Sequence, residues 1–261
     1  MFLKKLNKIA SNQSGVRASV MYGNILDQER YFKTLTYVKN KDILDCACGI
    51  GWGSYLIACV GDNHVTAVDL SKEAITAAKN YFNHPNIDFI NGDIDEIKIS
   101  KKFDIICSFE TIEHVQDPEK FLTILFNCAK EDCIFFLSTP NGNVFKSNKI
   151  PENPYHVDEY SRNEVEQFIK KSGWKIENYL GQYSIDPKNI NALNEYKDFI
   201  KNFWVEKKLS SRYGYIYKIS GKIFRRLFNK KIIDPAHRSS CKPIEISVGY
   251  EPAYHYYILR K

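Results

Sequence analysis

The stretch that decides the fold is Asp42-Ile43-Leu44-Asp45-Cys46-Ala47-Cys48-Gly49-Ile50-Gly51-Trp52-Gly53, followed by Ser54-Tyr55-Leu56-Ile57-Ala58. A short apolar run ends in an acid, a turn of small residues follows, and an amphipathic run begins. This order predicts a strand, a glycine-rich turn and the start of a helix. Alternating glycines allow a ligand to approach the backbone where a Cβ atom would collide with it. A tight turn that binds no ligand would give the same pattern.

The glycine spacing narrows the choice of ligand. No Gly-Lys-Ser/Thr follows the turn, which excludes a Walker-type phosphate loop, and Gly49-x-Gly51-x-Gly53 lacks the last spacing of a dinucleotide fingerprint. Asp45 disfavours a pyrophosphate, but it can accept hydrogen bonds from an ammonium group or from the loop backbone. The pattern acid-x-small-x-Gly-x-Gly resembles motif I of class I S-adenosylmethionine (SAM) methyltransferases, with Ala47 where many members carry the first glycine. The resemblance implies that Asp45, Gly49 and Gly51 form part of a SAM site.

Five strand-like runs alternate with helical runs and predict an α/β fold. They cover 42–45, 64–70, 86–91, 103–108 and 133–138. Such alternation is typical of an open parallel sheet with helices on both faces, in which ligands bind at the carboxyl ends of the strands. Two further runs, 174–181 and 253–259, complete a mostly parallel seven-stranded, Rossmann-like sheet. The resemblance implies that the last of these strands is inserted antiparallel.

Further cofactor contacts are expected at successive strand ends. Asp69, followed by Leu70, lies about 20 residues after the glycine-rich turn, where an acid can accept both ribose hydroxyls. A helix cap is the alternative role, for which Ser71 is better suited. The family resemblance implies that Asp93 and Ile94 contact adenine, although Gly92-Asp93 also suits a simple turn.

Two more residues are assigned to the cofactor. Ser108 ends the fourth strand, within the segment that resembles the family. Arg30 lies on a helix predicted over 25–38, where its guanidinium can pair with the carboxylate of the methionine moiety. An ordinary solvated arginine is the alternative interpretation of Arg30.

The segments after strands four and five carry the more specific resemblance. They read Ser108-Phe109-Glu110-Thr111-Ile112-Glu113-His114, Ser138-Thr139-Pro140-Asn141 and Asn153-Pro154-Tyr155-His156. They are similar to a bacterial branch of class I methyltransferases found in surface-polysaccharide and secondary-metabolite pathways, over about residues 25–182. The resemblance implies Glu110 and His114 beside the methionine moiety and the acceptor, and Asn141 and Tyr155 on the acceptor side.

His156 is the first candidate for a general base, because it lies in a loop on the acceptor side. A hydrogen-bonded loop histidine is the alternative, and Glu110 with His114 could simply tie a loop to a helix. The expected reaction moves a methyl group from SAM to an oxygen, a hydroxyl or a carboxylate, of an anionic or nucleotide-linked sugar, leaving S-adenosylhomocysteine. A quinone, lipid or small-amine acceptor is the alternative reaction, and a non-catalytic binding or assembly module is the alternative class.

Composition limits the partners and the compartment. The 261 residues are 44% hydrophobic and carry a formal net charge of +6, which favours anionic small molecules without demanding nucleic acid. The seven cysteines are odd in number and lie mostly in apolar runs, so reduced thiols and a cytoplasmic location are expected. No signal peptide or membrane span is expected, and no metal site is expected because no cluster has ligand spacing.

The chain is expected to comprise four segments. Residues 1–24 form an N-terminal lid or arm, 25–182 the SAM-binding core, 183–250 a basic and aromatic insertion, and 251–261 the last core strand. The insertion is expected to cap the acceptor pocket, with Arg225 and Arg226 near the acceptor. A dimer contact, an in-plane membrane helix over 210–231, and a solvated basic face packed on the core are the alternatives.

Overall fold

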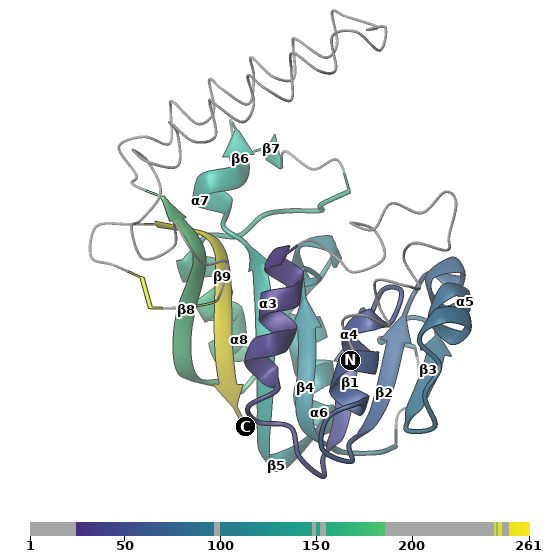
Figure 1. The fold of residues 1–261 in the computed structure, drawn as a ribbon. Coiled ribbons are helices and arrows are strands. Elements are labelled where there is room, and N and C mark those ends of the chain that lie inside the picture. The colour runs from purple at the N-terminus through teal and green to yellow at the C-terminus, as the bar shows by residue number, and fades with distance from the viewer. Residues whose placement is uncertain are drawn as a thin grey trace, which may run out of the picture.

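A computed structural model describes residues 25–96, 100–147, 150–151, 155–185, 243, 245–246 and 251–261. The predicted open sheet is confirmed, with seven strands in the order β3-β2-β1-β4-β5-β9-β8 (Figure 1). Strands β1 to β5 pair in parallel, and β9 runs antiparallel to both of its neighbours, as the family resemblance implied. The strands of this sheet are β1 (Asp42–Cys46), β2 (His64–Asp69), β3 (Ile87–Asn91), β4 (Phe103–Phe109), β5 (Ala129–Pro140), β8 (Lys175–Ile185) and β9 (Glu251–Arg260).

Helices cover both faces of the sheet. In three of them, a capping side chain explains where the helix starts. Ser71 caps α5 by accepting the backbone N–H of Ala74, and Asp117 caps α6 just before Pro118. Ser161 forms a capping box with Glu164 at the start of α8. The helices are α3 (Ile25–Thr34), α4 (Trp52–Ala58), α5 (Lys72–Tyr81), α6 (Pro118–Cys128), α7 (Gly142–Phe145) and α8 (Arg162–Lys171), with a 3-10 turn η1 (Ile112–His114). A small hairpin, β6 (Lys146–Ser147) and β7 (Ile150–Pro151), stands beyond the end of the sheet (Figure 1).

Alternation along the strands divides the core into two layers. Ile43 and Tyr256 point into the layer that holds α3, α4 and α5, whereas Leu44 and Tyr257 point into the layer that holds α6 and α8. All four side chains are buried. Because both faces of the sheet are covered, its carboxyl-end edge is where polar side chains can gather around a ligand.

Some boundaries differ from the sequence-based expectation. Helix α3 stops at Thr34 instead of residue 38, because the hydroxyls of Thr34 and Thr36 bond back to backbone carbonyls and the chain tightens into a turn. Strand β8 continues to Ile185, three residues beyond the expected end of the core. The N-terminal arm and nearly all of the 183–250 insertion lie outside the described residues.

Candidate functional site

A pocket of about 540 Å³ lies at the carboxyl ends of β1, β2, β3 and β4. It is lined by residues that follow all four strands and by the start of α6, so one cavity collects side chains from distant parts of the chain. Six of the residues assigned from the sequence line it: Asp69, Leu70, Asp93, Ile94, Glu110 and His114.

The glycine-rich loop beside this pocket combines an open position with tightly packed ones. Gly49 has a left-handed φ of 56°, and a Cβ added there would meet nothing within 4 Å. Gly51 also has a positive φ, of 80°, but a Cβ there would come within 2.6 Å of the Phe89 ring. Gly49 therefore leaves room for a ligand, whereas Gly51 allows α4 to pack closely on the sheet.

Asp69 fixes this loop and still has lone pairs to offer. Its Oδ2 accepts the backbone N–H of Gly49 at 2.8 Å, and its Oδ1 accepts that of Ser71 at 2.9 Å. Each carboxylate oxygen can accept a second hydrogen bond, so the group can also receive ribose hydroxyls. Leu70 is 71% exposed and lines the same pocket, where it offers an apolar surface to a ring.

Asp93 and Ile94 follow β3, the strand next to β2 in the sheet, and line the same pocket. Asp93 Oδ1 accepts the backbone N–H of Asp95 at 2.9 Å, which orients the carboxylate within a turn. Ile94 packs against the core layer of α6 and α8. An acid beside an apolar side chain suits a purine that carries an exocyclic amine. Asp93 therefore takes part in a turn, and this role is compatible with its predicted contact to adenine.

Asp45 has a different environment from the one expected. It is buried and accepts hydrogen bonds from the hydroxyls of Tyr31, at 3.0 Å, and Ser54, at 2.5 Å, and not from the loop backbone. Burial raises the pKa of Asp45 to about 6. The acid of the motif thus ties α3 and α4 to β1. Because the glycine-rich loop connects β1 to α4, these hydrogen bonds hold both ends of the loop in place.

Glu110 lies at the end of β4 with a left-handed backbone φ of 51°, which is uncommon for a residue with a side chain. Ser138 of β5 holds it twice, since its carbonyl accepts the Glu110 N–H at 3.0 Å and its hydroxyl donates to Glu110 Oε1 at 2.8 Å. Burial raises the pKa of Glu110, although the Arg30 guanidinium opposes the rise. Strained backbone of this kind is concentrated at functional sites.

Arg30 is not the solvated arginine that the alternative interpretation expected. It is 1% exposed, donates to Asp27 and Gln182 at 2.7 Å each, and places Nη2 3.2 Å from Glu110 Oε1. Its guanidinium also lies 4.9 Å from the centroid of the Tyr254 ring. The guanidinium therefore joins α3, β4, β8 and β9, and its pairing with a cofactor carboxylate stays a prediction.

Two histidines meet beside the pocket. The rings of His114 and His156 pack edge to face with their centroids 4.7 Å apart. Nδ1 of His114 lies 2.9 Å from the carbonyl oxygen of Tyr155, and Nδ1 of His156 lies 2.7 Å from Glu159 Oε1. Burial lowers the pKa of His156. His156 is therefore a hydrogen-bonded loop histidine, and its role as a general base stays a prediction.

Glu113 is a site residue that sequence reasoning missed. It is fully buried on η1, and its Oε2 accepts the Thr139 hydroxyl at 3.0 Å. Burial, followed by the neighbouring Glu110 carboxylate, raises its pKa well above the usual range. The sequence feature that could have identified Glu113 is its position between Glu110 and His114 in one short segment after β4.

Other assigned residues lie away from the pocket. Asn141 is buried, and its amide donates to the Pro252 carbonyl at 2.8 Å, so it anchors β9. The side chain of Tyr155 is 81% exposed, while Ser108 is fully buried. Arg225 and Arg226 lie outside the described residues.

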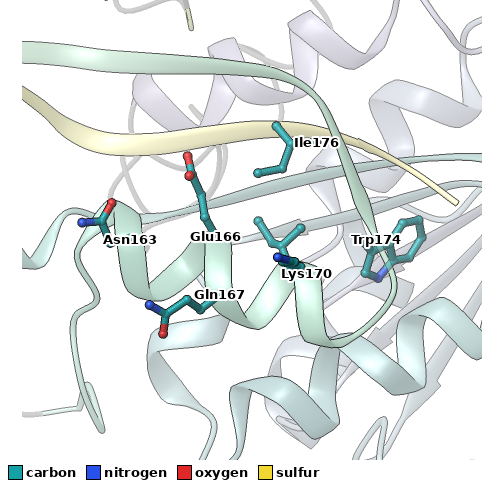
Figure 2. A pocket seen from close by; sticks show the side chains of 7 residues that line it. Asn163, Glu166, Gln167, Lys170, Trp174 and Ile176 are labelled. Atoms are coloured by element: carbon teal, nitrogen blue, oxygen red, sulfur yellow. The ribbon is translucent and has the colours of Figure 1, made fainter.

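A second hollow, of about 490 Å³, lies between α8 and the start of β8 (Figure 2). Trp174 and Ile176 stand at the amino-terminal end of β8, so this hollow is near the edge opposite the glycine-rich loop. None of the assigned site residues lines it. The cavity at the carboxyl ends is therefore the candidate functional site.

The strand order, the glycine-rich loop and the acids after β2 and β3 together define a class I SAM methyltransferase domain. A family described as methyltransferase domain matches residues 38–209, more than half of the chain, and the chain belongs to this family.

Named relatives agree with this class. A Mycolicibacterium smegmatis protein described as a probable S-adenosylmethionine-dependent methyltransferase is 28% identical over 55% of each chain. A ubiquinone biosynthesis O-methyltransferase from Glaesserella parasuis is 28% identical over 66% of this chain and 76% of the relative. The match spans about half the length of the mycobacterial relatives, 55% and 48%.

A solved structure shares the fold. The S-adenosylmethionine-dependent methyltransferase from Mesorhizobium loti superposes with a TM-score of 0.56 at 15% identity, covering 90% of this chain and all of the other. Among the residues described here, no helix combines the length and the apolar character needed to cross a membrane.

Proposed function

We propose that the protein transfers the methyl group of SAM to an oxygen atom of a small-molecule acceptor. The observation that carries this proposal is the shared cavity, in which Asp69 and Asp93 lie on one side and Glu110 and His114 on the other. The first pair suits the ribose and adenine, and the second pair meets the acceptor. A non-catalytic module would have no need of strained and buried acids beside its cofactor pocket.

The chain positions the two reactants for an in-line displacement, and positioning can supply much of the rate acceleration. Bound SAM supplies an electrophilic methyl group on a sulfonium. The acceptor oxygen forms a bond to the methyl carbon, the carbon–sulfur bond breaks with its electron pair remaining on sulfur, and a hydroxyl acceptor loses its proton. We assign removal of this proton to the cluster around His156, with His114 and Glu110 beside it. An imidazole base is one way to achieve this, and a bound cation is the other.

Two acceptor classes fit this proposal. A hydroxyl or carboxylate of an anionic or nucleotide-linked sugar suits the net charge of +6. A hydroxylated precursor of a quinone is favoured by the relatives named ubiquinone biosynthesis O-methyltransferase. In both cases the reacting atom is an oxygen, and the sugar is our first choice because the basic net charge favours an anionic acceptor.

The experiment has two parts. Calorimetry with S-adenosylhomocysteine tests cofactor binding, and absence of binding by the folded protein would contradict the proposal. Incubation with SAM and separate panels of nucleotide sugars, sugar acids, hydroxylated aromatic rings and amines then tests the acceptor. Mass spectrometry should find one added methyl group on an oxygen, and methylation confined to the amines would overturn the oxygen assignment.

A further inference from the structure

Three metal-ligand side chains converge at the acceptor side of the pocket. Glu113, His114 and His156 each offer one ligand atom, and these atoms all lie within 4.8 Å of one another. Two of the residues come from η1, and the third comes from the loop before α8. The backbone holds that loop in place, because the N–H groups of Val157 and Asp158 both point to the Glu113 carbonyl, at 2.8 and 3.3 Å.

Hydrogen bonds fix the tautomers of both histidines. A carbonyl oxygen only accepts, so the contact with Tyr155 requires a proton on Nδ1 of His114. The Glu159 carboxylate requires the same of His156. In each neutral ring the lone pair then resides on Nε2. An imidazole whose Nδ1–H is held by a carbonyl or a carboxylate is the usual arrangement of a metal-binding histidine.

The environment of Glu113 is a second observation, independent of the histidine tautomers, that favours a bound cation. Its side chain is fully buried, and its Oε1 has no hydrogen-bond partner among the described residues. A buried carboxylate oxygen without a partner is unfavourable, and a cation beside it would remove that cost. Glu110 is not part of this group of converging ligand atoms, and its Oε1 contacts Arg30 and Ser138 instead.

We propose that Glu113, His114 and His156 bind a divalent first-row transition-metal ion. Two imidazole nitrogens and one carboxylate suit zinc, manganese, cobalt or iron, whereas magnesium and calcium prefer oxygen ligands alone. Three protein ligands leave at least one coordination position open. His114 also lines the pocket, so an ion held by these residues would border the space assigned to the acceptor.

The consequence for catalysis rests on the proposed function. A divalent ion lowers the pKa of a hydroxyl bound to it, so a hydroxyl acceptor would lose its proton to water near neutral pH. In that case His156 is a ligand and not the base. Metal binding itself does not depend on methyl transfer and is tested separately.

The test uses the full chain, stripped with a chelator and dialysed. Cobalt(II) is added while the visible absorption is recorded, and zinc(II) and manganese(II) are titrated by calorimetry. We expect one ion per chain, with affinity reduced at least about tenfold in His114→Gln and His156→Gln. His114 is exposed, so its replacement preserves the fold, and Glu113→Gln is the third variant. His64→Gln is the matched control, because His64 is an exposed histidine at the start of β2.

The outcomes are separable. Stoichiometric binding that His64→Gln retains and His114→Gln and His156→Gln lose supports the site. No saturable binding, or binding that all variants share equally, overturns it. Loss of S-adenosylhomocysteine binding with metal binding intact counts against the proposed function alone. Methyl transfer to a hydroxyl that proceeds at full rate in the chelated enzyme overturns the catalytic role of the ion.

Discussion

The carboxylate of Asp69 accepts the backbone N–H of Gly49 at 2.8 Å, so the end of β2 sets the position of the loop after β1. Asp69 and Gly49, both assigned to the cofactor, are therefore held together by a hydrogen bond. A ligand that binds Asp69 meets a glycine-rich loop whose position this hydrogen bond has already fixed. Changes at Asp69 should affect both binding and the local structure.

Replacing Asp69 should separate these two contributions. Asp69→Ala removes the acceptor of Gly49 and the charge, and we expect S-adenosylhomocysteine binding to weaken by about 1–3 kcal/mol. Asp69→Asn keeps one oxygen for the loop and should lose less thermal stability, while binding still weakens. Calorimetry and thermal unfolding measure the two effects. The control is Asp88→Ala on exposed β3 surface, and equal affinities for all variants would remove Asp69 from the site.

Alanine at Gly51 should mainly lower the stability of the fold, whereas alanine at Gly49 should mainly lower the affinity for the cofactor. At Gly51 the new Cβ would approach the Phe89 ring at 2.6 Å, so Gly51→Ala should destabilise the fold by roughly 1–3 kcal/mol. At Gly49 the Cβ meets nothing, and the cost is about 1–2 kcal/mol for the left-handed backbone. We expect Gly49→Ala to lose more cofactor affinity per unit of lost stability. The reverse ranking would show that the ligand does not approach Gly49.

Asp45 should make stability depend on pH. Its folded pKa of about 6 lies above the ordinary aspartate value of 3.8, so between these values the folded state binds the proton more tightly. Unfolding then releases a proton, and stability should fall by roughly 3 kcal/mol as pH rises from about 4 to 6, with no further change above that. Denaturant unfolding of wild type and Asp45→Asn across this range isolates the effect. Parallel curves for the two proteins would contradict it.

Arg30 can be assigned by comparing two ligands. If the guanidinium only joins α3, β4 and β8, Arg30→Lys should lower the melting temperature and leave ligand affinity unchanged. If it also meets the methionine carboxylate, affinity for S-adenosylhomocysteine should fall by about 1.5–3 kcal/mol. Affinity for methylthioadenosine, which lacks that carboxylate, should then be unaffected. Gln182→Ala removes one partner of Arg30 without touching its charge, and serves as the control.

The order and type of the core elements could be predicted from the sequence, because the strands read as apolar runs and the helices begin with strong signals. Ser71, named from the sequence as a helix cap, does cap α5, and Asp117 and Ser161 cap α6 and α8 with the same residue types. The end of α3 could not be predicted, since apolar periodicity continued beyond Thr34 while threonine side chains bonded to the backbone. Local hydrogen bonding prevailed over hydrophobic spacing at that point.

The site was only partly predictable for a similar reason. Strand ends reveal Asp69 and Asp93, because parallel strands bring their carboxyl ends to one edge. The convergence of Glu113 and His114 with His156 is different, since it depends on how one loop folds back onto η1. Spacing along the chain carries no information about such a contact. The expectation that no metal would bind rested on spacing alone, and the metal site proposed above departs from that expectation.

The position of β9 between β5 and β8 has a consequence for folding order. Ile134 pairs with Arg260, and Lys175 pairs with the same residue from the other side, so both contacts join remote parts of the chain. Contacts of high sequence separation form slowly, because the intervening chain must lose entropy first. Until β9 arrives, β5 exposes an unpaired apolar edge that can recruit another chain. Refolding yield should therefore fall steeply with protein concentration, and the step that limits it is the insertion of a single strand.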